Sequence, residues 1–359
     1  MTFMTARVPA QVLRSTDHVL ASLPFLLGFQ PHSSAVLMWV REGTLILTQR
    51  IDIPQIPIGS NDSSTLDEWA IGVIKSASHA DSHEVLIAIF PPVLTKDLGP
   101  GLATTQDCDR SACRDLVAAL SRALVAAAKY PFAAWLVVED DFWKFDFATS
   151  NFSCTRKTVD PQVISEVHDD FLSAGWRHLT NRQEVVNEFD ADAGEQQLML
   201  GVITEQAKDV ETGERQARRD ESISSMVDSL NTSSTDHLAQ AQIITGLMDV
   251  QLRDCVLWQL TNHDRLASCA HTLRLALRAA PAGYRAPLAT VTALAFWIQG
   301  DGVRAGAALA QASLDNAHYG LAHLVDIALT NGVAPKMWSE SMGKVPYEAC
   351  RTGVASYLQ

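Results

Sequence analysis

The feature that constrains this fold most is a change in the spacing of apolar residues near Asp160. Before Asp160, continuous apolar runs at residues 35–40, 85–90 and 132–138 have the length of buried strands rather than of buried helices. After Asp160, apolar residues recur at helical spacing, and no run predicts a strand. We therefore expect an α/β domain with a mixed sheet and flanking helices over residues 1–190, followed by an all-α domain over residues 191–359.

A short helix is expected before the first two strands. Residues 12–23 are amphipathic, and Pro24 should stop the helix because proline restricts the preceding residue to extended backbone. Gly28 is suited to a left-handed cap for the apolar turn that follows. Residues 45–53 alternate between apolar and polar side chains, so they predict a strand that returns after a turn at Gly43.

Two helices alternate with the remaining strands. Residues 64–77 and 109–129 carry apolar side chains at helical spacing, and each segment precedes one of the apolar runs. Strand, helix and strand in this order predict crossover connections. A last strand over residues 142–147 returns after an acidic turn, so the sequence predicts five strands in the sheet.

The second half predicts a compact helical domain. A charged segment, residues 205–221, carries both signs of charge and predicts one solvated connecting helix. Further helices are expected at residues 236–260, 264–279, 287–298, 302–314 and 317–330. Alanine-rich contact faces make the later helices resemble one tetratricopeptide-like pair with a third helix. Repeat arrays usually need several such pairs, so a compact domain is the favoured interpretation.

Composition restricts the classes of partner. The 359 residues carry a formal net charge of −13, which argues against binding to nucleic-acid phosphates. No apolar run approaches the roughly 18 residues of a membrane span, so we expect no membrane partner. The six cysteines are scattered and show no metal spacing, and the N-terminus lacks the apolar core of a signal peptide. We therefore expect reduced thiols in a cytoplasmic protein that carries no metal and no cofactor.

Three segments resemble a known family. LASLPFLLGFQPHSSAVLMWV followed by TQRIDIP looks like the N-terminal signature of an actinobacterial family catalogued as domain of unknown function 4192. ALAFWIQGDGVRAGAALAQASLDNAHYGLAHLV and the weaker DDFWKFDF are similar to later parts of that family. The resemblance implies no activity. Members often look cysteine-rich after the middle aromatic segment, where this chain keeps only Cys154, so it implies no metal site either.

The first candidate site is the polar group His32, Ser33 and Ser34 before the first strand, with Arg50 and Asp52 facing it from the second strand. A histidine beside serines activates a nucleophile when a carboxylate orients the imidazole. The alternative is structural: serines near turns usually bond to backbone amides, and Arg50 and Asp52 can pair across the sheet. The structural interpretation is favoured, and ligand binding is the functional role left open for these residues.

Two further groups are candidates. Glu139, Asp140 and Asp141 form an acidic cluster at a strand end, where carboxylates can hold Mg²⁺, although a solvated turn is the favoured interpretation. The aromatic residues Trp297, Tyr319 and Trp338 line a possible interaction groove between the last helices, although tryptophan at helical spacing is more often core. Neither group predicts a catalytic residue.

The sequence favours a non-catalytic intracellular binding module over an enzyme. In this hypothesis the α/β domain recognises a small ligand or a protein partner, and the helical domain mediates association, with a homo-oligomer as one outcome. The alternative is a hydrolase that uses the His32, Ser33 and Ser34 cluster, or a Mg²⁺-dependent enzyme that uses Glu139 to Asp141. Catalytic motifs such as G-x-S-x-G and Gly-rich phosphate loops are missing from the sequence.

Overall fold

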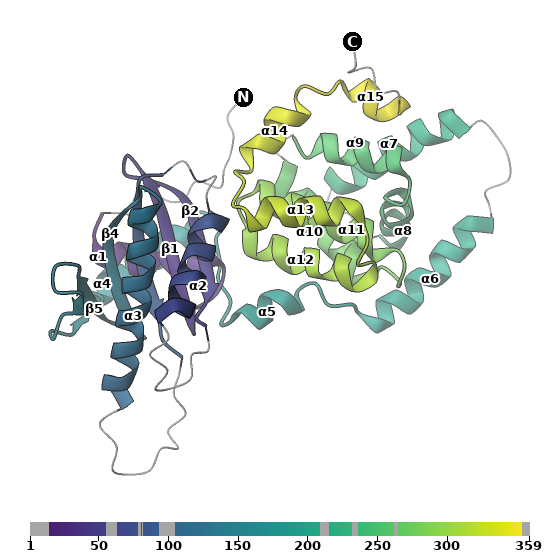
Figure 1. Cartoon of the computed structure of the whole chain (residues 1–359). Coiled ribbons are helices and arrows are strands. Elements are labelled where there is room, and N and C mark those ends of the chain that lie inside the picture. The colour runs from purple at the N-terminus through teal and green to yellow at the C-terminus, as the bar shows by residue number, and fades with distance from the viewer. Residues whose placement is uncertain are drawn as a thin grey trace. The chain divides into compact units, whose positions relative to one another are not determined.

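The computed structural model describes residues 14–54, 63–77, 80, 82–92, 105–208, 215–231, 236–261 and 265–353. The chain forms two compact units (Figure 1). The sheet unit holds the described residues up to Arg182 together with Thr330–Val333, and the helical unit holds Gln183–Leu329 and the residues from Ala334 onward. The expected order of an α/β part followed by an all-α part is confirmed.

One mixed sheet forms the centre of the sheet unit. Its main strands are β1 (Ser34–Arg41), β2 (Thr44–Asp52), β3 (Glu84–Phe90), β4 (Tyr130–Val138) and β5 (Asp141–Asp146), in the order β2-β1-β3-β4-β5. The pair β3–β4 is parallel, and the pairs β1–β2, β1–β3 and β4–β5 are antiparallel. Two short strands, β6 (Asn151–Phe152) and β7 (Lys157–Thr158), add to β5. All five predicted strands are therefore present.

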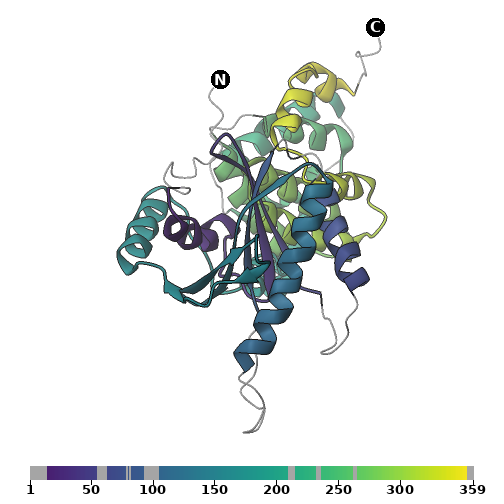
Figure 2. The ribbon, with the colours of Figure 1, turned by 60° about the vertical axis from the view of Figure 1, so that its left-hand side comes forward.

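Helices cover both faces of this sheet (Figure 2). On one face, α2 (Ser63–Ser76) and α3 (Thr105–Ala126) pack on the alternate β1 side chains Ala35, Leu37 and Trp39, which form the main core. On the other face lie α1 (Thr16–Leu27) and α4 (Pro161–Ser173), which pack against each other. Val36 and Met38 alternate with the first set and are also fully buried, as the continuous apolar run predicts.

The predicted end of the first helix at Leu23 is wrong. Helix α1 continues through Pro24 to Leu27, where Gly28 adopts the expected left-handed cap with a φ of 76°. Proline removes one backbone donor from the helix. The continuation buries Phe25, whose ring stacks on Phe171 of α4 at 4.7 Å, so tertiary packing outweighs the local preference.

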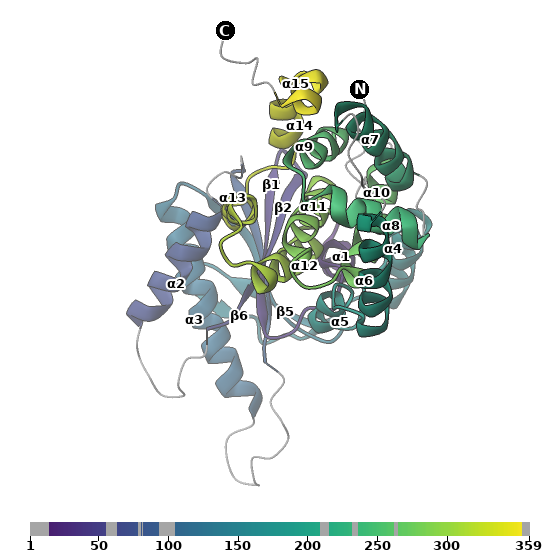
Figure 3. The same cartoon turned by 90° about the vertical axis from the view of Figure 1, so that its right-hand side faces the viewer.

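The helical unit is built around α11 (Arg285–Ile298), most of whose residues are buried, between α10 (Leu266–Ala279) and α12 (Gly302–Asp315) (Figure 3). The remaining helices are α5 (Arg182–Asn187), α6 (Ala193–Lys208), α7 (Arg215–Asn231), α8 (His237–Gly246), α9 (Val250–Gln259), α13 (Gly320–Thr330), α14 (Lys336–Met342) and α15 (Tyr347–Thr352). In the described part of the chain, none of the helices is both long enough and apolar enough to cross a membrane. The likeness to a tetratricopeptide pair stays a prediction.

The predicted connecting helix over residues 205–221 stays a prediction, because residues 209–214, between α6 and α7, lie outside the described residues. Another predicted helix is wrong in its extent. The segment 236–260 is two helices, because Asp249 accepts hydrogen bonds from the backbone amides of Gln251 and Leu252 and so starts α9. The charge pattern and the apolar spacing alone do not show this break, because Asp249 is compatible with one continuous helix as well as with the start of a second helix.

Candidate functional site

The polar group at the start of β1 is held by backbone bonds. Ser33 has a φ of 46°, and its carbonyl oxygen accepts a hydrogen bond from the Ile53 amide at 3.3 Å. The side chain of His32 is exposed, while its carbonyl oxygen accepts a hydrogen bond from Nη2 of Arg50 at 3.3 Å. The residues before β1 therefore join the first two strands through their main chain.

The structure brings Arg50 and Asp52 together but does not join His32 to a serine. Nη2 of Arg50 lies 2.7 Å from Oδ1 of Asp52, and the arginine side chain is only 14% exposed. Within the described residues, no hydrogen bond links the His32 imidazole to either serine hydroxyl, and Oγ of the fully buried Ser34 has no partner. A nucleophile needs a base within hydrogen-bond reach, and these side chains do not supply one in this arrangement.

The acidic cluster lies on the turn between β4 and β5. Glu139 and Asp140 are exposed, whereas Asp141 accepts a hydrogen bond from the Thr158 hydroxyl at 2.6 Å and lies 3.3 Å from Nη1 of Arg156. One of the three carboxylates is thus already engaged by the protein. Across the residues that the structure describes, no group of three His, Cys, Asp or Glu side chains is placed to hold a metal ion.

The three aromatic residues come from separate parts of the helical unit. Trp297 is buried in α11, the Tyr319 hydroxyl accepts a hydrogen bond from Nη1 of Arg253 at 3.0 Å, and Trp338 lies in α14. In the described part of the chain, no ring contact joins any two of them. The structure therefore does not bring these aromatic rings together.

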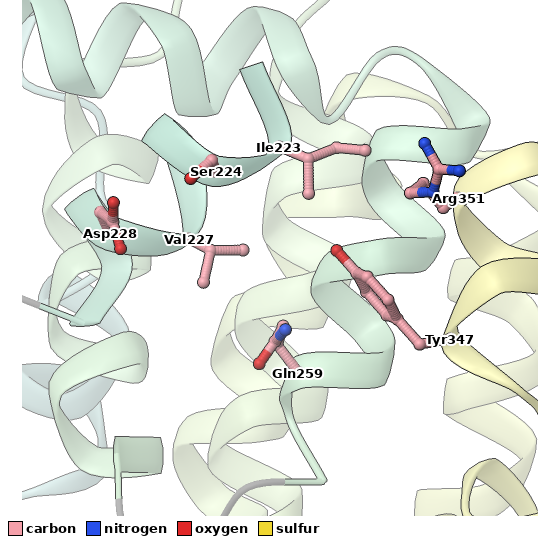
Figure 4. A pocket seen from close by; sticks show the side chains of 7 residues that line it. All are labelled: Ile223, Ser224, Val227, Asp228, Gln259, Tyr347 and Arg351. Atoms are coloured by element: carbon pink, nitrogen blue, oxygen red, sulfur yellow. The ribbon is translucent and has the colours of Figure 1, made fainter. Parts of the chain in front are cut away.

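A cavity of about 450 Å³ opens in the helical unit between α7, α9 and α15 (Figure 4). Its lining residues are Ile223, Ser224, Val227, Asp228, Gln259, Tyr347 and Arg351. The first four lie on α7, one lies at the end of α9, and the last two lie on α15. Ligand sites usually combine apolar walls with a few polar groups in this range of volume.

Two side chains of α9 hold α15 in place. Trp258 donates its indole N–H to the Val345 carbonyl oxygen at 2.9 Å, and Gln251 donates its amide to the Thr352 carbonyl oxygen at 3.0 Å. The Trp258 ring also packs on the Tyr347 ring, with a centroid distance of 5.0 Å. Because both ends of the short helix are tied to α9, Tyr347 and Arg351 are fixed one turn apart on the cavity wall.

The cavity has charged groups of opposite sign at its two ends. Arg351 donates to Glu348 through Nε at 2.9 Å and through Nη2 at 2.5 Å, and this bond lowers the pKa of the Glu348 carboxyl group. Asp228 lies at the opposite end, with Ile223, Val227 and Tyr347 between them (Figure 4). The arrangement places apolar side chains between the Asp228 carboxylate and an arginine that is paired with Glu348.

The Cys255 thiol, which is bonded to Tyr347 of the cavity wall, is not a nucleophile. Cys255 is fully buried, and burial raises its thiol pKa to about 11, with Tyr347 as its side-chain hydrogen-bond partner. A thiol with a pKa so far above neutrality remains protonated and weakly reactive. The Cys255 side chain therefore supports the wall of the cavity rather than chemistry inside it.

Comparison with known proteins gives one family and no function. A family model described as domain of unknown function (DUF4192) matches residues 17–336. The chain belongs to this family. No curated protein and no solved structure matches it significantly. Within this DUF4192 chain, the α7 and α9 part of the cavity lies inside the matched residues, whereas Tyr347 and Arg351 lie beyond them.

Sequence analysis of the DUF4192 chain named none of the cavity residues. The signal on α7 was present, because Ile223, Met226 and Leu230 are buried at helical spacing while Ser224 and Asp228 share the neighbouring stripe. The charged residues before them led to the interpretation of residues 205–221 as a solvated connecting helix. The helix α15 is only six residues long and carries no pattern that marks it as a wall of a site.

Proposed function

We propose that this DUF4192 protein is a non-catalytic binding protein whose helical unit holds a small ligand between α7, α9 and α15. The cavity of about 450 Å³ is the observation that carries the proposal. Its volume falls in the range of roughly 300–1,000 Å³ typical of ligand sites, and its lining combines apolar side chains with a hydroxyl, an amide and two charged groups.

Two observations in the sheet unit support binding over catalysis. The His32 imidazole is exposed and forms no bond to the neighbouring serines among the described residues, and Asp141 is engaged by Thr158 and Arg156. Neither arrangement prepares a nucleophile or a Mg²⁺ site. Recognition by the sheet unit, association through the helical unit and a homo-oligomer remain predictions from the sequence.

The proposal includes a location in the cytoplasm of an actinobacterium. The N-terminal signature resembles an actinobacterial family, which supports the origin. The cysteines whose side chains the structure describes, Cys113, Cys154, Cys255, Cys269 and Cys350, are free thiols, as expected in a reducing compartment.

A ligand-observed NMR screen with a library of small fragments tests the proposal. Ser224→Trp places a large side chain on the cavity wall, and Ser222→Trp places the same side chain on an exposed position of α7 outside the lining. Fragments that bind the wild type and the Ser222→Trp variant should not bind the Ser224→Trp variant. Turnover in a broad hydrolase and phosphatase screen, abolished by His32→Ala or Ser33→Ala, would contradict the proposal and show that the protein is an enzyme.

A further inference from the structure

We infer that the cavity takes an uncharged ligand that carries a planar amide group, such as a primary carboxamide or a lactam, on an apolar body. This inference rests on the proposed function and names the ligand class of the same site. It is carried by the Gln259 side chain, whose amide lines the cavity and has no hydrogen-bond partner among the described residues.

The two charged residues of the lining already have partners within the protein. The Arg351 guanidinium donates to both carboxylate oxygens of Glu348, through Nε and Nη2, and only 30% of its side chain is exposed. Asp228 also has an interaction partner in the protein, and it is exposed to solvent, where water and salt screen its charge. Neither residue therefore offers a free charge to a ligand.

The apolar part of the wall favours a neutral ligand. Ile223 is buried, and Val227 and the Tyr347 ring are half-buried beside it. An ion placed against these side chains gives up its hydration, and burial of a charge is costly without a free counter-charge. The apolar body of an uncharged ligand is stabilised by the same contact, because it leaves water.

Two neutral polar side chains of the lining, Gln259 and Ser224, have no hydrogen-bond partner within the part of the chain that the structure describes. Ser224 is exposed, so water can bond to its hydroxyl group. Gln259 is half-buried at the end of α9, in the part of the cavity between Val227 and Tyr347 (Figure 4). A half-buried amide loses part of its hydration, and a bond to a ligand would compensate for that loss.

A planar amide matches both polar atoms of the Gln259 side chain. The glutamine amide presents a carbonyl acceptor and an N–H donor side by side. A primary carboxamide or a lactam presents the same pair in reverse order, so two parallel hydrogen bonds can form at once. A ketone would accept from the Gln259 N–H and leave its carbonyl oxygen without a donor. The lining therefore selects an amide among uncharged polar groups.

A series of benzene derivatives of nearly equal shape tests this inference in the unaltered protein. NMR titrations that follow the Ile223 and Val227 methyl groups give the dissociation constants. We expect benzamide to bind, and acetophenone, which has a methyl group in place of the amide nitrogen, to bind about tenfold more weakly. Benzoate and benzamidinium should also lose about tenfold relative to benzamide, because each would bury a charge without a free partner.

Variants assign the amide and the charges to their residues. Gln259→Met removes the donor and the acceptor and nearly keeps the length of the side chain, so it should bind benzamide and acetophenone equally well. Gln197→Met, at an exposed position of α6 outside the lining, is the matched control and should keep the preference for benzamide. Glu348→Gln should strengthen the binding of benzoate and leave benzamide unchanged, because Arg351 then loses its charged partner.

The outcomes separate the ligand class from the site. Binding of benzoate or benzamidinium as tight as that of benzamide, blocked by Ser224→Trp, would overturn the uncharged ligand and leave the binding site intact. The same holds if the whole series fails to bind while screened fragments bind and are blocked by Ser224→Trp. A preference for benzamide that survives Gln259→Met would overturn the role of this amide. An unchanged benzoate affinity in Glu348→Gln would overturn the paired arginine as the reason for excluding anions.

One result would count against the inference and the proposed function together. Binding of benzamide that Ser224→Trp does not affect would show that the cavity is not the site.

Discussion

At the scale of single residues, two buried serines of the sheet unit should contribute differently to the free energy of unfolding. The Ser82 hydroxyl lies 2.8 Å from the Val40 carbonyl oxygen and 2.9 Å from that of Glu84, whereas the Ser34 hydroxyl has no partner among the described residues. Ser82→Ala should therefore lower the free energy of unfolding by about 1 kcal/mol, and Ser34→Ala should leave it unchanged or raise it. Urea unfolding measures both. An equal loss for the two variants would show that the Ser34 hydroxyl is bonded in solution.

A buried arginine organises the core of the helical unit. Arg285 donates to the carbonyl oxygens of Leu277 and Phe189 and to Oε1 of Gln311, at 2.7, 3.2 and 2.7 Å. Arg285→Met leaves these acceptors, and the more distant Ala280 carbonyl oxygen, without this donor, so the free energy of unfolding should fall by about 3 kcal/mol. The control Arg278→Met, with 40% of its side chain exposed, should cost less than about 0.5 kcal/mol. Similar losses for both variants would contradict the account.

The residues that line the proposed binding site were the feature that the sequence predicted least well. The polar group at β1 was found because its members are adjacent in the chain. The cavity joins α7, Gln259 and α15, which lie far apart in the sequence, and the packing of both α7 and α15 on α9 brings them together. Long-range neighbours of this kind have no periodic signature, so a single sequence does not reveal them.

At the scale of elements, the sequence predicted those strands and helices whose positions depend on residues close to them in the chain. The five main strands follow from apolar runs, and α4 follows from Asp160 as N-cap with Pro161 in the first turn. The continuation of α1 through Pro24 depends on packing against α4, which no local signal records. Helices α14 and α15 are short and mostly polar in pattern, so they were missed.

The break between α8 and α9 gives a prediction at this scale. Asp249 caps α9 through the backbone amides of Gln251 and Leu252, at 2.8 and 3.3 Å. Asp249→Ala should lower the free energy of unfolding by about 1 kcal/mol, because the first turn of α9 loses its acceptor. Asp326→Ala, an exposed position within α13, should cost less than about 0.5 kcal/mol in the same thermal or urea measurement. No difference between the variants would mean that α8 and α9 are separated for another reason.

At the scale of the whole molecule, the buried thiols predict an alkaline limit to stability. Burial raises the pKa of Cys255 and Cys269 to about 11, and both lie in the helical unit. An unfolded thiol titrates near pH 8.5, so between there and pH 11 the unfolded chain loses protons that the folded chain keeps. Stability should be constant with respect to these groups below that window and fall within it. The Cys255→Ala/Cys269→Ala variant should show a shallower fall in unfolding experiments from pH 8 to 11, and an unchanged slope would contradict the assignment.

The central claim is that the helical unit binds a ligand while the polar start of β1 serves the fold. Methyl NMR during titration with a fragment selected by the ligand-observed screen tests this claim most directly, because it reports both units in one experiment. The account predicts shifts for the methyl groups of Ile223 and Val227 on the cavity wall and none for Val36 and Ile51, which flank the β1–β2 polar group. Shifts at Val36 and Ile51 with none at Ile223 and Val227 would contradict it.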